Sequence, residues 1–305
     1  MMRTTTGLPL VADERRLGLT RIVVPTAVGP VVARIGAGSG ASGLVLIHGA
    51  AASWTTWTPL LQAAAIAGRP LSGVVAVDLP GWGGSPAPRV PLDAARAAEA
   101  VAEVARAAGL ERWSVIGHSL GGFVALRLAA TEPAATEAVV LVSPSGPAVV
   151  RAVQRPLLGG LRLPWFAGMR LAMRMLAAMP QEGAALLRVL DRTGVLSRLS
   201  APLFADRAAV HPSVPAALAE EVRPRAFTAA TAAATDADVQ EWSRVRCRVR
   251  SVRGLHDVFV GRRDAERLRA LLPDFAEVTV PDAGHFAAVE RPDAVLAALD
   301  AARGA

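Results

Sequence analysis

The segment "IGHSLGG" (116–122) contains the side chain with the clearest potential for chemistry. Ser119 lies between Gly117 and Gly121 and fits the pattern G-x-S-x-G. An apolar run precedes the pattern and a helical pattern follows it, so Ser119 is expected in a sharp turn from strand to helix. Small residues on both sides let the strand and the helix approach closely. A serine presented there, beside the N–H groups of a helix N-terminus, is typical of a nucleophile that attacks carbonyl groups.

A serine hydroxyl needs a base that accepts its proton, and His285 is the best candidate among five histidines. It follows the last expected strand, in the loop "VPDAGHFAAVERP". A histidine at the carboxyl end of that strand can reach a serine at the carboxyl end of a central strand. Of the other histidines, His48 lies in a turn after a strand, and His118 is the neighbour of Ser119. His211 lies in the strand-poor segment 147–244, and His256 is the neighbour of Asp257.

The base in turn needs an acid that orients it, and Asp257 is the first candidate. Asp257 follows the apolar segment "VRSVRG" and so lies at the carboxyl end of an expected strand. Asp282 is close to His285 in sequence but precedes its loop, and it ranks second. Asp78 also ends a strand, but a Gly/Pro-rich turn follows it. Asp78 is therefore expected to stabilise that turn through its backbone.

Short apolar runs alternate with longer helical patterns over most of the chain. Strands are expected at 21–24, 31–37, 43–49, 73–81, 113–118, 138–146, 247–257 and 276–281. Helices are expected at 57–68, 91–110, 120–130, 263–272 and 292–302. Strands that are apolar on both faces and separated by helices indicate a parallel sheet covered on both sides.

The alternation stops near Gly146 and resumes near Cys247. Residues 147–244 contain no convincing buried strand and are rich in Pro, Ala, Arg and Met. We therefore predict an α/β fold with a mostly parallel eight-stranded sheet and helices on both faces. Its core is expected to span 1–146 and 245–305, with a helical cap (147–244) inserted after strand six.

Five segments in this order resemble the α/β-hydrolase superfamily, in its capped, single-domain form. They are "LVLIHGAAASW", "VVAVDLPGWGGS", "VIGHSLGG", "GLHDVFV" and "VPDAGHFAAVERPDAV". The order Ser119, Asp257, His285 is the nucleophile–acid–base order of that fold. The resemblance implies an oxyanion hole formed by the backbone N–H groups of Leu120 and Ala50, with Ala51 as the alternative.

Composition narrows the remaining possibilities. The formal charge is +7, but the chain contains no Lys, Asn or Tyr and its 33 basic residues are all Arg, as a GC-rich genome would produce. The arginines are spread along the chain without interleaved aromatic residues, so no nucleic-acid partner is expected. With the single Cys247, no internal disulfide can form, and we expect no metal site and no cofactor. The sequence contains neither a secretory signal nor a membrane-spanning stretch, which predicts a bacterial cytoplasmic protein without a membrane partner; its oligomeric state stays open.

These features favour a carboxylesterase-like serine hydrolase that acts on a small acyl substrate through an acyl-enzyme. A hydrolase of C–C bonds, or a natural-product hydrolase or thioesterase, would use the same three residues, and a C–C hydrolase would need a polar partner such as Arg151 or Arg253. A binding protein without turnover is the third reading. In the cap, four apolar side chains at helical spacing are expected to contact substrate: Trp165, Phe166, Met169 and Met173. Arg170 and Arg174 are then expected on the outer face of the same helix, in solvent.

Overall fold

The computed structural model describes residues 7–38, 40–235 and 237–304, and its centre is one eight-stranded sheet. The strand order across the sheet is β1-β2-β4-β3-β5-β6-β7-β8. The strands are β1 (Leu19–Thr26), β2 (Gly29–Gly36), β3 (Ser42–Ile47), β4 (Val74–Val77), β5 (Arg112–His118), β6 (Thr136–Val142), β7 (Arg248–Gly254) and β8 (Phe275–Val280). Residues 1–6, part of the N-terminal segment in which no secretory signal is expected, lie outside the described residues.

The direction of the strands confirms the predicted mostly parallel sheet. Strands β1 and β2 form an antiparallel hairpin, and β2 also runs antiparallel to β4. Every other neighbouring pair, from β4 through β8, is parallel. The carboxyl ends of β3 to β8 therefore meet at one edge, where active sites of such sheets lie.

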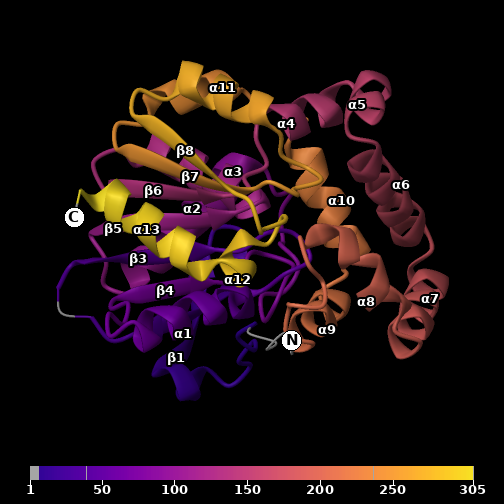
Figure 1. The fold of residues 1–305 in the computed structure, drawn as a ribbon, viewed down its shortest axis with the longest axis horizontal. Helices are drawn as coiled ribbons and strands as arrows, with labels where there is room; N and C mark the ends of the chain where they lie inside the picture. Colours follow the sequence, from indigo (N-terminus) through magenta and orange to yellow (C-terminus); the bar gives the residue numbers. More distant parts are fainter. Residues whose placement is uncertain (1–6, 39, 236, 305) are drawn as a thin grey trace.

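Helices cover both faces of the sheet (Figure 1), because successive side chains of the central strands point to opposite sides. On β3, Val45 and Ile47 join one hydrophobic core, and Leu44 and Leu46 join the other. The first core includes α2 (Ala94–Ala107), α3 (Leu120–Thr131) and α11 (Arg262–Leu271). The second includes η2 (Trp54–Trp57), α1 (Thr58–Ile66), α12 (Ala287–Glu290) and α13 (Pro292–Arg303).

Between β6 and β7 the described chain is helical. Its elements are α4 (Pro147–Gln154), α5 (Pro156–Arg162), α6 (Pro164–Ala178), α7 (Pro180–Arg192), α8 (Val195–Leu199), η3 (Ala201–Leu203), α9 (Ser213–Glu220), α10 (Pro224–Ala233) and η4 (Val239–Arg244). Figure 1 shows α5 to α10 gathered beside the sheet, with α5, α6 and α7 on the side that faces away from it. At the end of this segment, η4 packs its buried Trp242 edge-on against Phe123 of α3, so η4 belongs to the helical layer of the core.

Hydrogen bonds fasten the helical insertion to the loop after β4. The guanidinium of Arg223 donates to the carbonyl oxygens of Gly81 (3.2 Å) and Gly83 (3.0 Å), and the Gly83 N–H donates to Glu221 (3.1 Å). The loop itself is organised by the buried Asp78, whose carboxylate accepts from the N–H groups of Trp54 and Gly84 and pairs with Arg34. Asp78 therefore stabilises this turn, as predicted, but through its side chain.

Candidate functional site

Ser119 occupies a strained turn between β5 and α3. Its φ of 49° lies in the left-handed region, which costs a non-glycine residue about 1–3 kcal/mol. The close packing around the turn explains why its neighbours are glycines. A Cβ atom on Gly117 would lie 2.4 Å from the Gly121 carbonyl oxygen, and one on Gly121 would lie 2.0 Å from the Ile47 carbonyl oxygen. Side chains at those positions would push α3 away from the sheet.

The imidazole of His285 is hydrogen-bonded to the carboxylate of Asp257. His285 Nδ1 lies 3.0 Å from Asp257 Oδ2 and 3.1 Å from Oδ1. The Asp257 side chain is fully buried, and its Oδ1 also accepts from the N–H groups of Phe259 (2.8 Å) and Val260 (3.1 Å). Burial alone would raise the pKa of Asp257, but the charge and hydrogen bond of His285 and the backbone donors outweigh it and lower the pKa. Asp257 is therefore ionised at neutral pH.

That hydrogen bond also sets the proton position on the histidine. A carboxylate only accepts, so Nδ1 carries the proton and Nε2 of neutral His285 is left free to act as a base. Ser119 and His285 line the same cavity. Among the described residues, the Ser119 hydroxyl forms no direct hydrogen bond to the imidazole; in enzymes without substrate such contacts are often long.

His118, the neighbour of Ser119, contacts His285 through a hydrogen bond and ring packing. Its Nε2 donates to the His285 carbonyl oxygen over 3.0 Å, and the two rings lie 4.9 Å apart between centroids. Burial and the adjacent His285 lower the pKa of His118 to about 3, so its imidazole is neutral. Phe259 closes the other side of the catalytic-base candidate, edge-on at 4.8 Å. No local sequence pattern signals this role of His118 beyond its place in the motif.

Glu290 and Leu203 connect the His285 loop to the helical insertion, at the end of η3 and the segment between η3 and α9. The Leu203 carbonyl accepts from the His285 N–H over 2.7 Å. The Glu290 carboxylate accepts from the N–H groups of Gly284 (2.8 Å) and Ala205 (2.7 Å). Burial raises the pKa of Glu290, and the backbone donors partly oppose that rise. The sequence pattern did not reveal either residue, because the contacts join segments about 80 residues apart.

The backbone beside Ser119 offers N–H groups for an oxyanion. Leu120 is the first residue of α3, so its N–H has no carbonyl partner one turn earlier in the helix. Ala50, Ala51 and Leu120 all line the cavity next to Ser119. Ala51 has a φ of 53°, which marks a tight turn after β3. These groups are the donors that the resemblance implied, and the choice between Ala50 and Ala51 stays a proposal.

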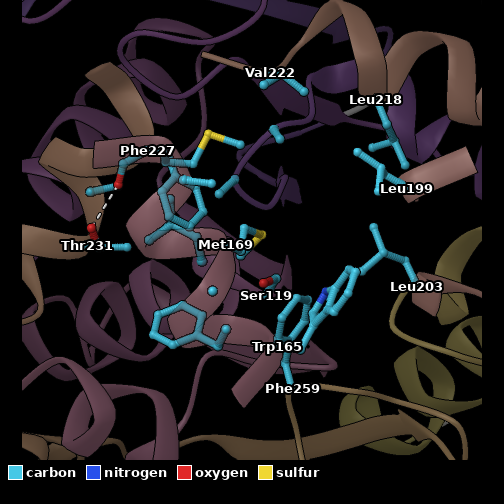
Figure 2. Close-up of a pocket in the computed structure, with 18 of the residues that line it drawn as sticks. Ser119, Trp165, Met169, Leu199, Leu203, Leu218, Val222, Phe227, Thr231 and Phe259 are labelled. Atoms are coloured by element: carbon cyan, nitrogen blue, oxygen red, sulfur yellow. Dashed lines mark hydrogen bonds between the residues drawn. The ribbon is translucent and has the colours of Figure 1, made fainter. Parts of the chain in front are cut away.

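Ser119 opens into a large apolar cavity under the helical insertion. The cavity measures about 680 Å³, within the roughly 300–1,000 Å³ of small-molecule sites. Figure 2 shows Ser119 among the lining residues Trp165, Met169, Leu203 and Phe259. Its lining is almost wholly aliphatic and aromatic, and no Arg, Asp or Glu of the described residues contributes to it.

Few polar groups remain available inside this cavity. The Thr231 hydroxyl donates to the Phe227 carbonyl (Figure 2), and the Ser200 hydroxyl donates to the Ser197 carbonyl, so both serve their own helices. What remains near the expected reaction centre is Ser119, the His285 imidazole and Ser145, all of which line the cavity. The cavity therefore suits an uncharged, apolar group attached to the bond that reacts.

The four predicted cap residues all line the cavity, in two different settings. Phe166 is buried and packs edge-on against Phe259, with 6.3 Å between ring centroids. Met169 and Met173 are half-buried, and Trp165 is 41% exposed. The helix α6 thus both anchors the cap to the core and forms part of the cavity wall.

Arginine positions require two corrections. From the helical spacing, Arg170 was expected in solvent beside Arg174; Arg174 is exposed, but Arg170 is half-buried and donates to the Val153 carbonyl over 3.5 Å. Arg253 was considered as a substrate partner for C–C cleavage. Its side chain is instead buried between β7 and β8, bonded to Glu277 (3.1 Å) and to Thr279 (2.8 Å).

Arg151 does not contribute to the cavity lining either. It lies on α4, outside the cavity, where burial and neighbouring arginines lower its pKa. The arginine partner considered for a C–C hydrolase is therefore absent from the lining that the structure describes.

The remaining candidates lie away from the reaction centre. Asp282 is 66% exposed and pairs with Arg291, so the structure does not bring it to His285. His48 accepts from the Leu79 N–H (3.0 Å) and donates to the Gly49 carbonyl (2.7 Å), which fixes the turn after β3.

The last two histidines also lie outside the cavity. His211 is bonded within its own turn to Ser213 (2.9 Å), and His256 is exposed. Neither residue lines the space above Ser119.

Within residues 7–38, 40–235 and 237–304, no group of three or more His, Cys, Asp or Glu side chains is arranged to hold a metal ion. No helix in the same ranges is long and apolar enough to cross a membrane.

Residues 44–298 match the sequence model of the alpha/beta hydrolase family, which spans both parts of the core and the helical insertion. The chain belongs to the alpha/beta hydrolase family. This hydrolase is 37% identical over 110 residues to Rv2715, an uncharacterized protein of Mycobacterium tuberculosis strain H37Rv; the match covers 36% of this chain and 31% of that protein. The curated relatives are matched over only 25–37% of their own length.

Solved structures share the fold over nearly the whole chain. An esterase from Exiguobacterium antarcticum has a TM-score of 0.68 at 15% identity, covering 94% of this chain and 100% of its own. A bacterial membrane phospholipase A has a TM-score of 0.68 at 24% identity, covering 96% and 89%. At these identities the likeness establishes the fold, which is the fold predicted from the sequence.

The buried His118 predicts a pH dependence of stability. Its pKa is about 3 in the folded protein and about 6.5 when unfolded. Between these values only the unfolded chain holds the proton, so the free energy of unfolding falls as the pH drops below about 6.5, by up to ~1.4 kcal/mol per pH unit for this group. Urea unfolding measured at several pH values from 4 to 7 gives the free energy of unfolding as a function of pH. This free energy should depend less steeply on pH in His118→Gln than in the wild type. His256→Gln, at an exposed position, is the control; an unchanged slope in His118→Gln would contradict the assignment.

Proposed function

We propose that this hydrolase cleaves carboxylic esters with an apolar acyl or alcohol group, through an acyl-enzyme on Ser119. The observation that carries the proposal is the buried Asp257–His285 hydrogen bond, which leaves Nε2 of His285 free in the cavity that Ser119 enters. The strained turn at Ser119 and the start of α3 beside it support the proposal, because acyl transfer requires a nucleophile next to backbone N–H donors.

In the proposed mechanism, His285 takes the proton of Ser119 while Oγ attacks the ester carbonyl. The N–H groups of Leu120 and of Ala50, or alternatively Ala51, stabilise the tetrahedral oxyanion. Each such donor contributes about 3–4 kcal/mol to lowering the barrier. Asp257 holds the imidazole in the required tautomer and stabilises its charged form. His285 then donates the proton to the leaving alcohol, and a water activated by the same base releases the acid.

The lining of the cavity supports the choice of substrate class. Apolar side chains extend from Ser119 to Leu190 of α7 and Leu196 of α8, which leaves room for a long chain. A charged substrate group would lose its hydration there without gaining a partner. A C–C hydrolase is therefore disfavoured, while a thioesterase or a natural-product hydrolase with an apolar acyl group remains compatible with the same residues. We retain the cytoplasm as the proposed location.

Ser119→Ala should lower kcat for p-nitrophenyl butyrate by about 10⁴-fold or more, because the substitution removes the nucleophile. Steady-state kinetics measures the loss. Ser145→Ala is the matched control, since Ser145 lines the same cavity and loses the same hydroxyl. Equal losses in the two variants, or full activity of Ser119→Ala, would contradict the assignment.

Asp257→Asn should lower kcat by about 10⁴-fold, because the amide favours the wrong imidazole tautomer. Asp282→Asn should leave kcat within about twofold, as is usual for an exposed carboxylate remote from the chemistry. The same assay compares the two variants. A larger loss in Asp282→Asn than in Asp257→Asn would show that the acid has been misassigned.

The cavity should give a preference for longer acyl chains. Over p-nitrophenyl esters from acetate to octanoate, kcat/KM should rise, since each buried methylene contributes up to ~0.8 kcal/mol. Met173→Glu should abolish the rise by placing a carboxylate in the wall. Ala178→Glu, an exposed position at the end of the same helix that does not line the cavity, should retain it. A flat profile in the wild type, or an unchanged one in Met173→Glu, would be inconsistent with this substrate class.

A further inference from the structure

The outer side of the cap exposes apolar side chains that no described part of the chain covers. Helices α5, α6 and α7 lie on the side of the cap away from the sheet (Figure 1). Leu157 is 89% exposed, Leu161 83% and Leu171 60%. Single exposed apolar residues are common, but a cluster on adjacent helices marks an interaction surface.

A second set of exposed apolar residues rims the cavity. Five large hydrophobic side chains are both solvent-exposed and part of the cavity lining: Trp165, Met175, Met179, Leu186 and Leu199. The helices α6, α7 and α8 that carry these residues therefore form part of the rim of the cavity, and α6 packs against α5. We refer to α5, α6, α7 and α8 together as the outer cap face.

The outer cap face also carries most of the net charge of the chain. Residues 155–199, from the residue before α5 to the end of α8, contain seven Arg and two carboxylates, a formal net charge of +5, against +7 for the whole chain. Arg155, Arg162 and Arg174 are exposed, and none of them forms an ion pair with another described residue. The rest of the chain is nearly neutral, so the cap face is a local positive surface.

We propose that the outer cap face binds the surface of an anionic lipid membrane, with the mouth of the cavity against the lipid. Exposed leucine and methionine side chains with arginines beside them are the combination by which helices lie in a membrane interface. Trp165 at the mouth fits the same setting, because its ring is apolar and its indole N–H is polar. This is peripheral binding, which requires no membrane-spanning segment, and it revises the expectation from the sequence that the protein has no membrane partner.

Charge argues for lipid and against a second copy of the chain. A twofold dimer through this face would place +5 against +5, whereas anionic headgroups neutralise the arginines. If the proposed esterase function is correct, an apolar substrate could pass from the lipid into the cavity without crossing water. That consequence rests on the proposed function, but the binding itself does not.

Sedimentation of the purified full chain with vesicles tests the proposal without any assay of turnover. One set of vesicles is phosphatidylcholine, and in the other a third of the lipid is phosphatidylglycerol. The expected result is binding to the anionic vesicles that is about tenfold or more stronger and that weakens as salt is added. Failure to bind, or equal binding to both sets, would overturn the proposal while leaving the esterase proposal intact.

Two double variants locate the binding face without altering the cavity lining. Arg155→Glu with Arg162→Glu should abolish the preference for anionic vesicles, and Leu157→Ser with Leu161→Ser should weaken binding at least tenfold. Two control variants change solvent-exposed residues outside the cap. Arg16→Glu with Arg21→Glu makes the same charge change near β1, and Ile66→Ser removes one exposed apolar side chain on α1. Both controls should bind as the wild type does. Near-ultraviolet circular dichroism checks that every variant is folded.

Wild-type binding in the cap variants would overturn the assignment to this face. Sedimentation velocity separates the competing occupant: a dimer that the leucine variant dissociates, without vesicle binding by the wild type, would identify a second copy of the chain and overturn the lipid proposal.

Discussion

The close crossing of strand β5 and helix α3 over the end of β3 constrains the rest of the site. There is no room for a side chain at Gly121, because its Cβ would overlap the Ile47 carbonyl. The chain must therefore turn within Ser119, at a positive φ that is strained by about 1–3 kcal/mol. The parallel strands on both sides hold the turn, since β5 is bonded to β3 and β6 over its whole length. The result is a hydroxyl fixed beside the N-terminus of α3.

The same constraint determines how the base is supported. His118 lies directly under the turn, so its ring can hold the His285 loop from the core side. The cap holds that loop through the Leu203 carbonyl, which accepts from the His285 N–H. The Glu290 carboxylate, on α12, joins the loop to the cap by accepting from the N–H groups of Gly284 and Ala205. Movement of the cap would therefore reach His285 through these contacts, and the apolar mouth and the base belong to one connected unit.

The elements could be predicted from the sequence, and the candidate catalytic residues could be proposed from it, because both leave local signals. Apolar runs and glycines at short spacing identified the strands and the turn at Ser119, and the carboxyl ends of strands pointed to Asp257 and His285. The support from Glu290 could not be predicted, since it depends on contacts between distant segments. Arg253 was misjudged for the same reason: its burial is set by Glu277 on the neighbouring strand, which no local pattern reports.

The structure of the hydrolase after reaction with a long-chain p-nitrophenyl alkylphosphonate tests the central claim most directly. The proposed mechanism predicts phosphorus bonded to Ser119 Oγ. One phosphoryl oxygen should lie within hydrogen-bonding distance of the Leu120 N–H and of the Ala50 or Ala51 N–H. It also predicts His285 Nε2 close to Ser119 Oγ, and the alkyl chain in the apolar cavity. Phosphorus on another side chain, or an unmodified protein after long incubation, would contradict it.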